Sequence, residues 1–279
     1  MRIGLGLPTA IAGSPAGLTL EWARLAETGP FDSLALHDRL AFESLEPITT
    51  LAAVAAVTRR IRLACLVLIA PLRGSAVMLG KQLRTVAALA GPSRLTIGLG
   101  VGPRRDDYEA AGLPFEQRSR MLDEQLVDLL PLLGRDVELL TGGSGRAALG
   151  RMVRAADGFC HEGGDPQAFR SAADRARIAW SESGRPGRPR LWSLGYFALG
   201  PGSPRTGRQA LERYYSFTGG HAAGIAAGLL TSADAISAYC DGYREAGCDE
   251  LVLFPTVFPT VADLSQVELL GRAPQERWR

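Results

Sequence analysis

The segment from residue 137 to residue 159 carries the pattern that most directly suggests chemistry. It reads VELLTGGSGRAALGRMVRAADGF: an apolar run, a cluster of glycines and an amphipathic helical pattern. A strand that opens through glycines onto a helix start presents free backbone N–H groups, which bind anions. Ser144 is expected to cap the helix, and Arg146 adds a positive charge beside it. We interpret this loop as a phosphate site for a nucleotide-like cofactor. The alternative is an ordinary strand-to-helix turn in which glycine relieves backbone strain.

Two of the three histidines, His37 and His161, also follow short apolar runs. The ordinary pKa of histidine lies near neutrality, so a small shift lets the ring give or take a proton. For His37 the alternatives are a proton donor or ring contact, and a histidine bonded to a loop carbonyl. For His161 they are a contact to the polar chain of a cofactor, and a structural role. The nearby arginines, Arg39, Arg104 and Arg105, either approach a phosphate or carboxylate or pair with neighbouring aspartates.

Eight short apolar runs alternate with helical patterns along the chain and must position these residues. The runs are apolar nearly throughout, which is typical of parallel strands covered on both faces. Eight such units in 279 residues predict a single (β/α)8 barrel domain over residues 1–279, with a doubly wound open sheet as the alternative. Residues 200–230 are glycine-rich and predict broken helices or a mobile lid. The predicted strands are Arg2–Leu7, Ser33–His37, Ile61–Leu68, Arg94–Gly100, Val137–Leu140, Gly158–His161, Leu191–Leu199 and Glu250–Phe254.

A barrel would bring the polar residues together, because the loops after the strands meet at one rim. The lining between them would be apolar and rich in backbone, so that a flat aromatic ring can lie there. We expect a flavin-like ring on this lining and its phosphate on the glycine loop. The expected cofactor-binding residues are Leu7, Val67, Leu68, Gly100, Gly142, Gly143, Ser144, Gly145, Arg146 and His161. No cluster of carboxylates and histidines suggests a metal site.

Composition narrows the class of partners. The chain has 31 Lys and Arg against 29 Asp and Glu, a net charge of +2, which argues against nucleic-acid or membrane-surface binding. The four cysteines have no CxxC spacing, as expected for free thiols in a reducing compartment. No signal peptide or apolar run of membrane-spanning length is evident. We therefore expect a cytoplasmic location.

Five segments, in order along nearly the whole chain, resemble the bacterial luciferase-like flavin monooxygenase family. They are FDSLALHDRL (31–40), RIRLACLVLIAPLRGSAVMLGKQLRTV (60–86), RLTIGLGVGPRRDDYEAAGLPFEQRSRMLDE (94–124), LLTGGSGRAALGRMVRAADGF (139–159) and EAGCDELVLFP (245–255). The resemblance implies a (β/α)8 barrel that uses reduced FMN with oxygen, or the deazaflavin coenzyme F-420. It also implies a non-proline cis peptide within Cys65–Leu68, and a homodimer formed through the region around Met78.

Two departures from the family pattern affect the expected chemistry. Many relatives end the second strand with a histidine that acts as acid or base, whereas Arg39 stands at that place here. His37 lies two residues upstream, on the same face of an extended strand, so it is the substitute candidate. We therefore name His37 and Arg39 as candidate catalytic residues. The chain is also short between the fourth helix and the fifth strand, near Leu133.

The resemblance predicts an oxidoreductase, in first place a monooxygenase that uses reduced FMN from a separate flavin reductase. Coenzyme F-420-dependent hydride transfer and a non-catalytic flavin-binding protein are the alternatives. The substrate is expected to be a small organic molecule held by the loops of the rim. Four aromatic residues, Tyr196, Tyr214, Tyr215 and Phe217, suggest that this substrate is apolar or aromatic.

Overall fold

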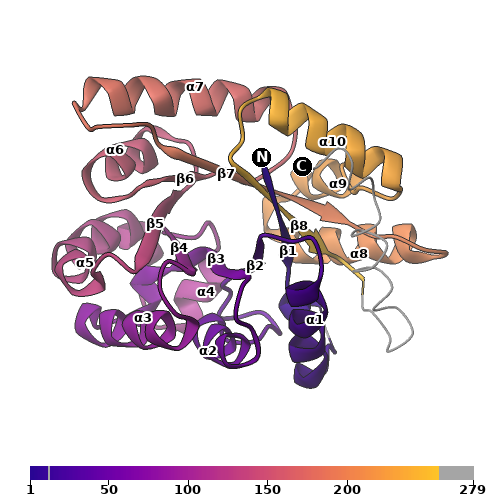
Figure 1. The fold of residues 1–279 in the computed structure, drawn as a ribbon, viewed down its shortest axis with the longest axis horizontal. Helices are drawn as coiled ribbons and strands as arrows, with labels where there is room; N and C mark the ends of the chain where they lie inside the picture. The colour runs from indigo at the N-terminus through magenta and orange to yellow at the C-terminus, as the bar shows by residue number, and fades with distance from the viewer. Residues whose placement is uncertain (12, 258–279) are drawn as a thin grey trace.

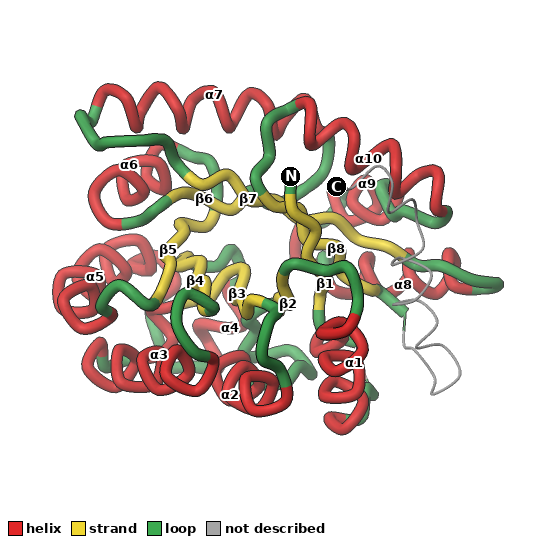
Figure 2. The backbone as a smooth tube through the Cα atoms, in the orientation of Figure 1, coloured by secondary structure: helices red, strands yellow, loops and turns green. Residues whose placement is uncertain are grey.

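The fold is a closed parallel barrel surrounded by helices (Figures 1 and 2). The computed structural model describes residues 1–11 and 13–257. Each strand pairs with the next in sequence order, and the last pairs with the first. This closure confirms the predicted (β/α)8 barrel and excludes the open doubly wound sheet. The strands are β1 (Arg2–Gly6), β2 (Ser33–Leu36), β3 (Arg62–Ile69), β4 (Leu95–Gly100), β5 (Val137–Gly142), β6 (Gly158–Cys160), β7 (Arg190–Phe197) and β8 (Glu250–Pro255).

The helices lie outside the barrel and cover its strands (Figure 2). Several begin with a side chain that caps the first turn, as Ser75 does by accepting from the N–H of Met78. The α-helices are α1 (Ala16–Thr28), α2 (Pro47–Val57), α3 (Ala76–Ala90), α4 (Arg105–Ala110), α5 (Arg118–Leu133), α6 (Arg146–Ala155), α7 (Pro166–Glu182), α8 (Ser203–Tyr214), α9 (His221–Ala227) and α10 (Ala233–Glu245). Short 3-10 helices are η1 (Pro8–Ala10), η2 (Ala70–Arg73), η3 (Phe115–Gln117) and η4 (Ser216–Thr218).

Buried apolar side chains form two concentric layers. The outer layer fills the space between the strands and the helices and includes Trp22 and Phe169, which are fully buried. The inner layer fills the barrel and includes Leu66, Trp192 and Phe254. Such a layered interior is a packed core and not a pore, so chemistry is confined to the ends of the strands.

Charged residues close the amino-terminal end of the barrel. The carboxylate of Glu250 is fully buried and forms ion pairs with the guanidinium groups of Arg2 and Arg62. Burial raises the pKa of Glu250, and the charge of Arg62 acts in the opposite direction. Because this end of the barrel is filled, the opposite rim is the part of the fold open to a site.

The third strand contains a bulge that changes which side chains face inward. Cys65 pairs with Ile97, but Leu68 pairs with Leu99, so β3 has one residue more than β4 over this interval. The extra residue places both Leu66 and Val67 on the inner side, Leu66 in the inner core and Val67 against glycines of the neighbouring strands. The Leu66–Val67 peptide bond is cis, which confirms the cis peptide expected within Cys65–Leu68.

Two local expectations had different outcomes. Residues 200–230 form the short helices α8, η4 and α9, which confirms the prediction of broken helices. The prediction that Ser144 caps a helix is wrong, because α6 begins at Arg146 and its N-cap is Gly145, with no capping side chain. Within the described ranges, no helix has both the length and the apolar character needed to cross a membrane.

Candidate active site

The floor of the site is formed where Val67 rests on two adjacent strands. A Cβ atom added at Gly100 would lie 2.6 Å from Val67 Cγ2, and one added at Gly142 would lie 2.7 Å from Val67 Cγ1. A Cβ at Gly98 would also come within 2.9 Å of Val67 Cγ1. Glycine is therefore needed on β4 and β5 so that the bulge of β3 can lean across them. Val67 itself is half-buried.

His37 lies beside this floor, immediately after β2. Its Nδ1 atom is 2.7 Å from the carbonyl oxygen of Leu66, and its ring stacks on Phe254 with the centroids 3.9 Å apart. Burial lowers the pKa of His37 to about 4; the bond to Leu66 opposes this shift, and the charge of Arg39 adds to it. The ring is therefore neutral at pH 7 and does not carry a proton to donate as an imidazolium.

Two tyrosines continue from His37 towards the rim. The hydroxyl of Tyr196, on β7, lies 3.3 Å from His37 Nε2, and the hydroxyl of Tyr215 lies 2.6 Å from that of Tyr196. Burial raises the pKa of both hydroxyls above the ordinary tyrosine value, so each keeps its proton at neutral pH. The site thus holds a connected row of neutral hydrogen-bonding groups.

Arg39 is fixed by a buried ion pair and does not lie in this row. Its Nε donates to Asp107 Oδ2 at 2.8 Å, and both side chains are almost fully buried. The other oxygen of Asp107 accepts the backbone N–H groups of Leu40 and Ala41. The guanidinium also lies 5.3 Å from the ring centroid of Tyr214. Arg39 therefore ties the loop after β2 to α4, which is a positioning role.

The remaining rim arginines are also paired. Arg104 binds Asp106 at 2.8 Å and donates to the carbonyl oxygen of Tyr214 at 2.6 Å. Arg105 pairs with Glu116, and both side chains are exposed. Pairing with a neighbouring aspartate is therefore confirmed for Arg104 but not for Arg105, which pairs with Glu116 instead.

The glycine-rich loop lies on the same rim, between β5 and α6. Gly143 has a φ of +87°, which favours glycine, and a Cβ atom at Gly143 or Gly145 would meet no other atom within 4 Å. With no side chain capping α6, the N–H groups of its first turn have no side-chain acceptor. The loop thus combines open space, free backbone donors and the positive end of a helix dipole, the features that bind a phosphate.

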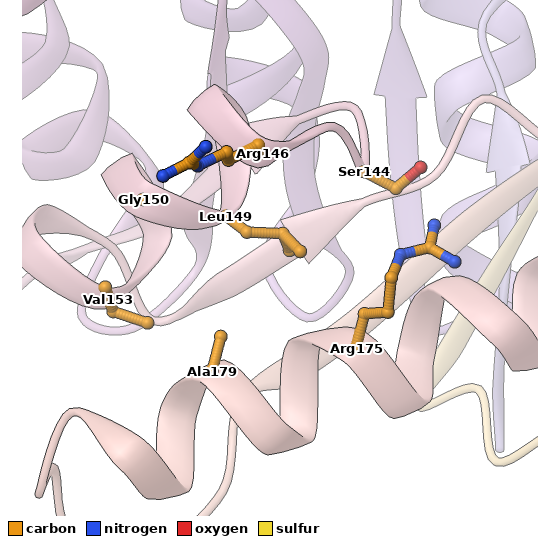
Figure 3. A pocket seen from close by; sticks show the side chains of 7 residues that line it. All are labelled: Ser144, Arg146, Leu149, Gly150, Val153, Arg175 and Ala179. Atoms are coloured by element: carbon orange, nitrogen blue, oxygen red, sulfur yellow. The ribbon is translucent and has the colours of Figure 1, made fainter.

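A cavity of about 410 Å³ adjoins this loop between α6 and α7 (Figure 3). Ser144 and Arg175 lie at the same end of it, with the Arg175 guanidinium directed towards the loop, whereas Arg146 points away from them. Within the described residues no carboxylate forms an ion pair with Arg175 or Arg146. Arg175 was not among the predicted site residues, because it lies in the middle of α7 and only the fold brings it beside residue 144.

Three other predicted site residues lie away from open surface. Leu7 and Leu68 are buried in the outer core layer, so their side chains pack against helices. His161 is 5% exposed, and its Nδ1 accepts the N–H of Gly163 at 3.3 Å. Burial lowers the pKa of His161. In residues 1–11 and 13–257, no group of three His, Cys, Asp or Glu side chains is placed to hold a metal ion.

The closed parallel barrel places this chain in the class of (β/α)8 proteins, with its candidate site at the carboxyl ends of the strands. The family model for luciferase-like monooxygenases matches residues 1–140, which is half of the chain. The chain belongs to this family, and it is therefore an enzyme of the oxidoreductase class. An uncharacterized protein of Mycobacterium tuberculosis is 29% identical over 208 residues, covering 58% of this chain and 71% of that protein. The same figures hold for an uncharacterized protein of Mycobacterium bovis.

Solved structures share the fold over the whole chain. An F-420-dependent secondary alcohol dehydrogenase, in complex with an F-420–acetone adduct, has a TM-score of 0.83 at 15% identity and covers 100% of this chain and 99% of its own. The monooxygenase RslO1 from Streptomyces bottropensis has a TM-score of 0.81 at 17% identity, covering 100% of both chains. EDTA monooxygenase from Chelativorans sp. BNC1 has a TM-score of 0.73 at 13% identity, covering 99% of this chain and 94% of its own. At these identities the likeness concerns the fold.

Proposed function

We propose that this protein is a flavin-dependent monooxygenase that uses reduced FMN and oxygen on a small organic substrate. The observation that carries the proposal is the open glycine loop at the carboxyl end of a luciferase-like barrel. Its backbone N–H groups, together with Ser144 and Arg175, offer neutral and charged donors to a phosphate. The donor set therefore fits a phosphorylated cofactor of the flavin type.

The proposed roles divide between the two parts of the rim. The N–H of Gly143 donates to the carbonyl of Cys160, so Gly142 and Gly143 shape the loop, while Ser144, Gly145, the first turn of α6 and Arg175 hold the phosphate. Val67 supports the ring from the bulge of β3. Arg146, which points away in Figure 3, contributes through its backbone N–H and through the field of its charge. When bound, the reduced cofactor supplies electrons to oxygen. The chain contributes binding, orientation and exclusion of water, which its apolar lining supports.

A binding experiment tests the phosphate role. The purified chain is titrated with FMN and, as a matched control, with riboflavin, which has the same ring and no phosphate. Charge-assisted hydrogen bonds contribute about 1.5 to 3 kcal/mol each, so FMN is expected to bind at least about tenfold more tightly. Equal affinity for the two, or no binding of either, contradicts the assignment of the glycine loop.

Hydride transfer with coenzyme F-420 is the second candidate function. It is supported by the likeness to a dehydrogenase whose structure contains this coenzyme. Reduced FMN and reduced F-420 are each titrated into the protein under anaerobic conditions, and the affinities are compared. Tighter binding of F-420, with no oxygenated product formed in the presence of FMN, a reductase and oxygen, favours the second candidate. Membership in an enzyme family weighs against a non-catalytic flavin-binding protein.

The expected partners follow from this proposal. A separate flavin reductase supplies reduced FMN, and a second copy of the chain associates through α3, where Val77 and Met78 are 66% and 58% exposed. Sedimentation of the protein at micromolar concentration tests the dimer, and substitution of Met78 by Glu is expected to give a monomer. We propose a cytoplasmic location, which the four buried free cysteines support.

A further inference from the structure

The row formed by His37, Tyr196 and Tyr215 has a fixed direction, because each hydrogen in it can be assigned. The carbonyl oxygen of Leu66 can only accept, so the hydrogen between it and His37 is on Nδ1. A neutral imidazole carries one N–H, so Nε2 is left as an acceptor. The hydroxyl of Tyr196, 3.3 Å away, must therefore donate to Nε2.

The direction continues to the end of the row. Tyr196 has one hydroxyl hydrogen, and it is directed to His37, so its oxygen accepts from Tyr215 at 2.6 Å. Tyr215 thereby uses its own hydrogen. Only lone pairs remain on the free side of the Tyr215 oxygen. The terminal group of the row is consequently an acceptor and cannot act as a donor.

The surroundings of Tyr215 keep this direction at neutral pH. Burial is the main cause that raises the pKa of Tyr215, and the charge of Glu162, from the loop after β6, adds to it, while the hydrogen bond to Tyr196 and the charges of Arg39 and Arg104 act in the opposite direction. Arg39 donates through Nε to Asp107, and Arg104 donates to Asp106 and to the carbonyl of Tyr214, whereas Arg39 Nη1 is buried and has no hydrogen-bond partner among the described residues. Glu162 is exposed and accepts hydrogen bonds only. Tyr215 is half-buried, with aromatic neighbours in Tyr214 and Phe217.

We propose that Tyr215 selects substrates whose polar group is a hydrogen-bond donor, and that the substrate class is a hydroxylated aromatic molecule, a phenol. This proposal rests on the proposed function, because it specifies the substrate of the same site. The phenol hydroxyl donates to Tyr215, and its ring packs among the aromatic side chains. An ether or ketone of the same shape presents only acceptors and leaves the Tyr215 lone pairs unpaired. Tyr196 and His37 are positioning residues that fix which way the Tyr215 hydrogen points.

Matched ligands test the direction of the row. Binding of 4-methylphenol, a donor, and 4-methylanisole, which can only accept, is measured by calorimetry on the full chain with FMN present and with FMN absent. 4-Methylphenol is expected to bind about 3- to 10-fold more tightly than 4-methylanisole, because one hydrogen bond contributes about that much to affinity. Tyr196→Phe frees the Tyr215 hydrogen, so the preference is expected to fall to about onefold. Tyr239→Phe, which removes a hydroxyl bonded to the Leu194 carbonyl outside the row, is the control and keeps the preference.

A second measurement does not depend on any ligand. In protein labelled with ¹⁵N-histidine, the His37 resonances, identified by their loss in His37→Asn, are expected to report a neutral ring protonated on Nδ1 at pH 7. A ring protonated on Nε2 overturns the proposal, as do equal affinities for the two probes, failure of the phenol to bind at millimolar concentration, or a preference that survives in Tyr196→Phe. FMN affinity is followed separately in every variant. Loss of FMN binding with the phenol preference intact refutes the proposed cofactor and leaves the substrate class standing.

Discussion

Substitution of Gly100 by Ala should strain the floor of the site through a single contact. The added Cβ would lie 2.6 Å from Val67 Cγ2, and the next two nearest atoms of the surroundings also belong to Val67. Val67 is β-branched and its side chain is stiff, so it cannot swing aside at low cost. Overpacking of this kind costs about 1 to 3 kcal/mol of unfolding free energy. We therefore expect Gly100→Ala to destabilise the protein by that amount.

A double-mutant cycle isolates the contact. Val67→Ala removes the clashing methyl and leaves the Val67 Cβ at 3.4 Å, an ordinary contact distance. Alone, it costs about 1 kcal/mol for the partly buried methyl groups it removes. If the strain is as described, the variant with both changes is about as stable as Val67→Ala alone, a coupling of about 1 to 3 kcal/mol.

Urea unfolding followed by circular dichroism measures all four corners of the cycle. Gly17→Ala, in helix α1 where the added Cβ meets nothing within 4 Å, is the control and should be neutral or slightly stabilising. Additive effects of the Gly100 and Val67 changes would refute the account of the floor. FMN affinity should also fall in Gly100→Ala, because the shifted Val67 no longer supports the ring as proposed.

Three further predictions concern charge. Asp107→Asn removes the buried carboxylate nearest to Arg39 and leaves only the more distant, half-exposed Asp106, so it is expected to cost about 3 kcal/mol in urea unfolding. Asp106→Asn is expected to cost about 1 kcal/mol or less, and equal costs would contradict the assignment. Because folding lowers the pKa of His37 to about 4, the unfolded chain binds more protons than the folded chain between pH 6.5 and 4. The free energy of unfolding should therefore fall as the pH drops through this window. His37→Gln should flatten that part of the pH profile. Arg175→Gln should weaken FMN binding about tenfold and leave riboflavin binding unchanged, while the same change at Arg146 has a smaller effect; a larger effect at Arg146 would reverse their assignment.

The strands and their order could be predicted from sequence because each is a short apolar run bounded by polar residues. The sixth strand shows this well: Gly158–Cys160 is only three residues long, yet it lies within the predicted range. Closure into a barrel followed from counting eight such runs. The predicted N-cap of α6 was wrong by one residue, because Ser144 and Gly145 are both acceptable N-caps and only the backbone conformation of the loop decides between them.

The arrangement of the site could be predicted only in part. His37, Gly100 and residues 142–145 lie at one rim, as expected from their positions at or just after the ends of strands. The pairing of Arg39 with Asp107 and of His37 with Tyr196 joins residues 68 and 159 positions apart. Such contacts depend on loop conformations and side-chain rotamers, which no local pattern encodes. The position of the bulge in β3 also leaves no mark in the sequence pattern, because residues 63–69 are all apolar.

The match to the family model ends at residue 140, and the rim is divided at nearly the same point. The first half of the barrel contributes His37 and Val67, whereas Tyr196 and Tyr215 come from the second half, on β7 and just after α8. Under the proposed roles, a change of residues in the α8–α9 segment is expected to alter substrate preference while the surface proposed for the cofactor stays in place. Exchange of this segment between related barrels is then expected to change selectivity.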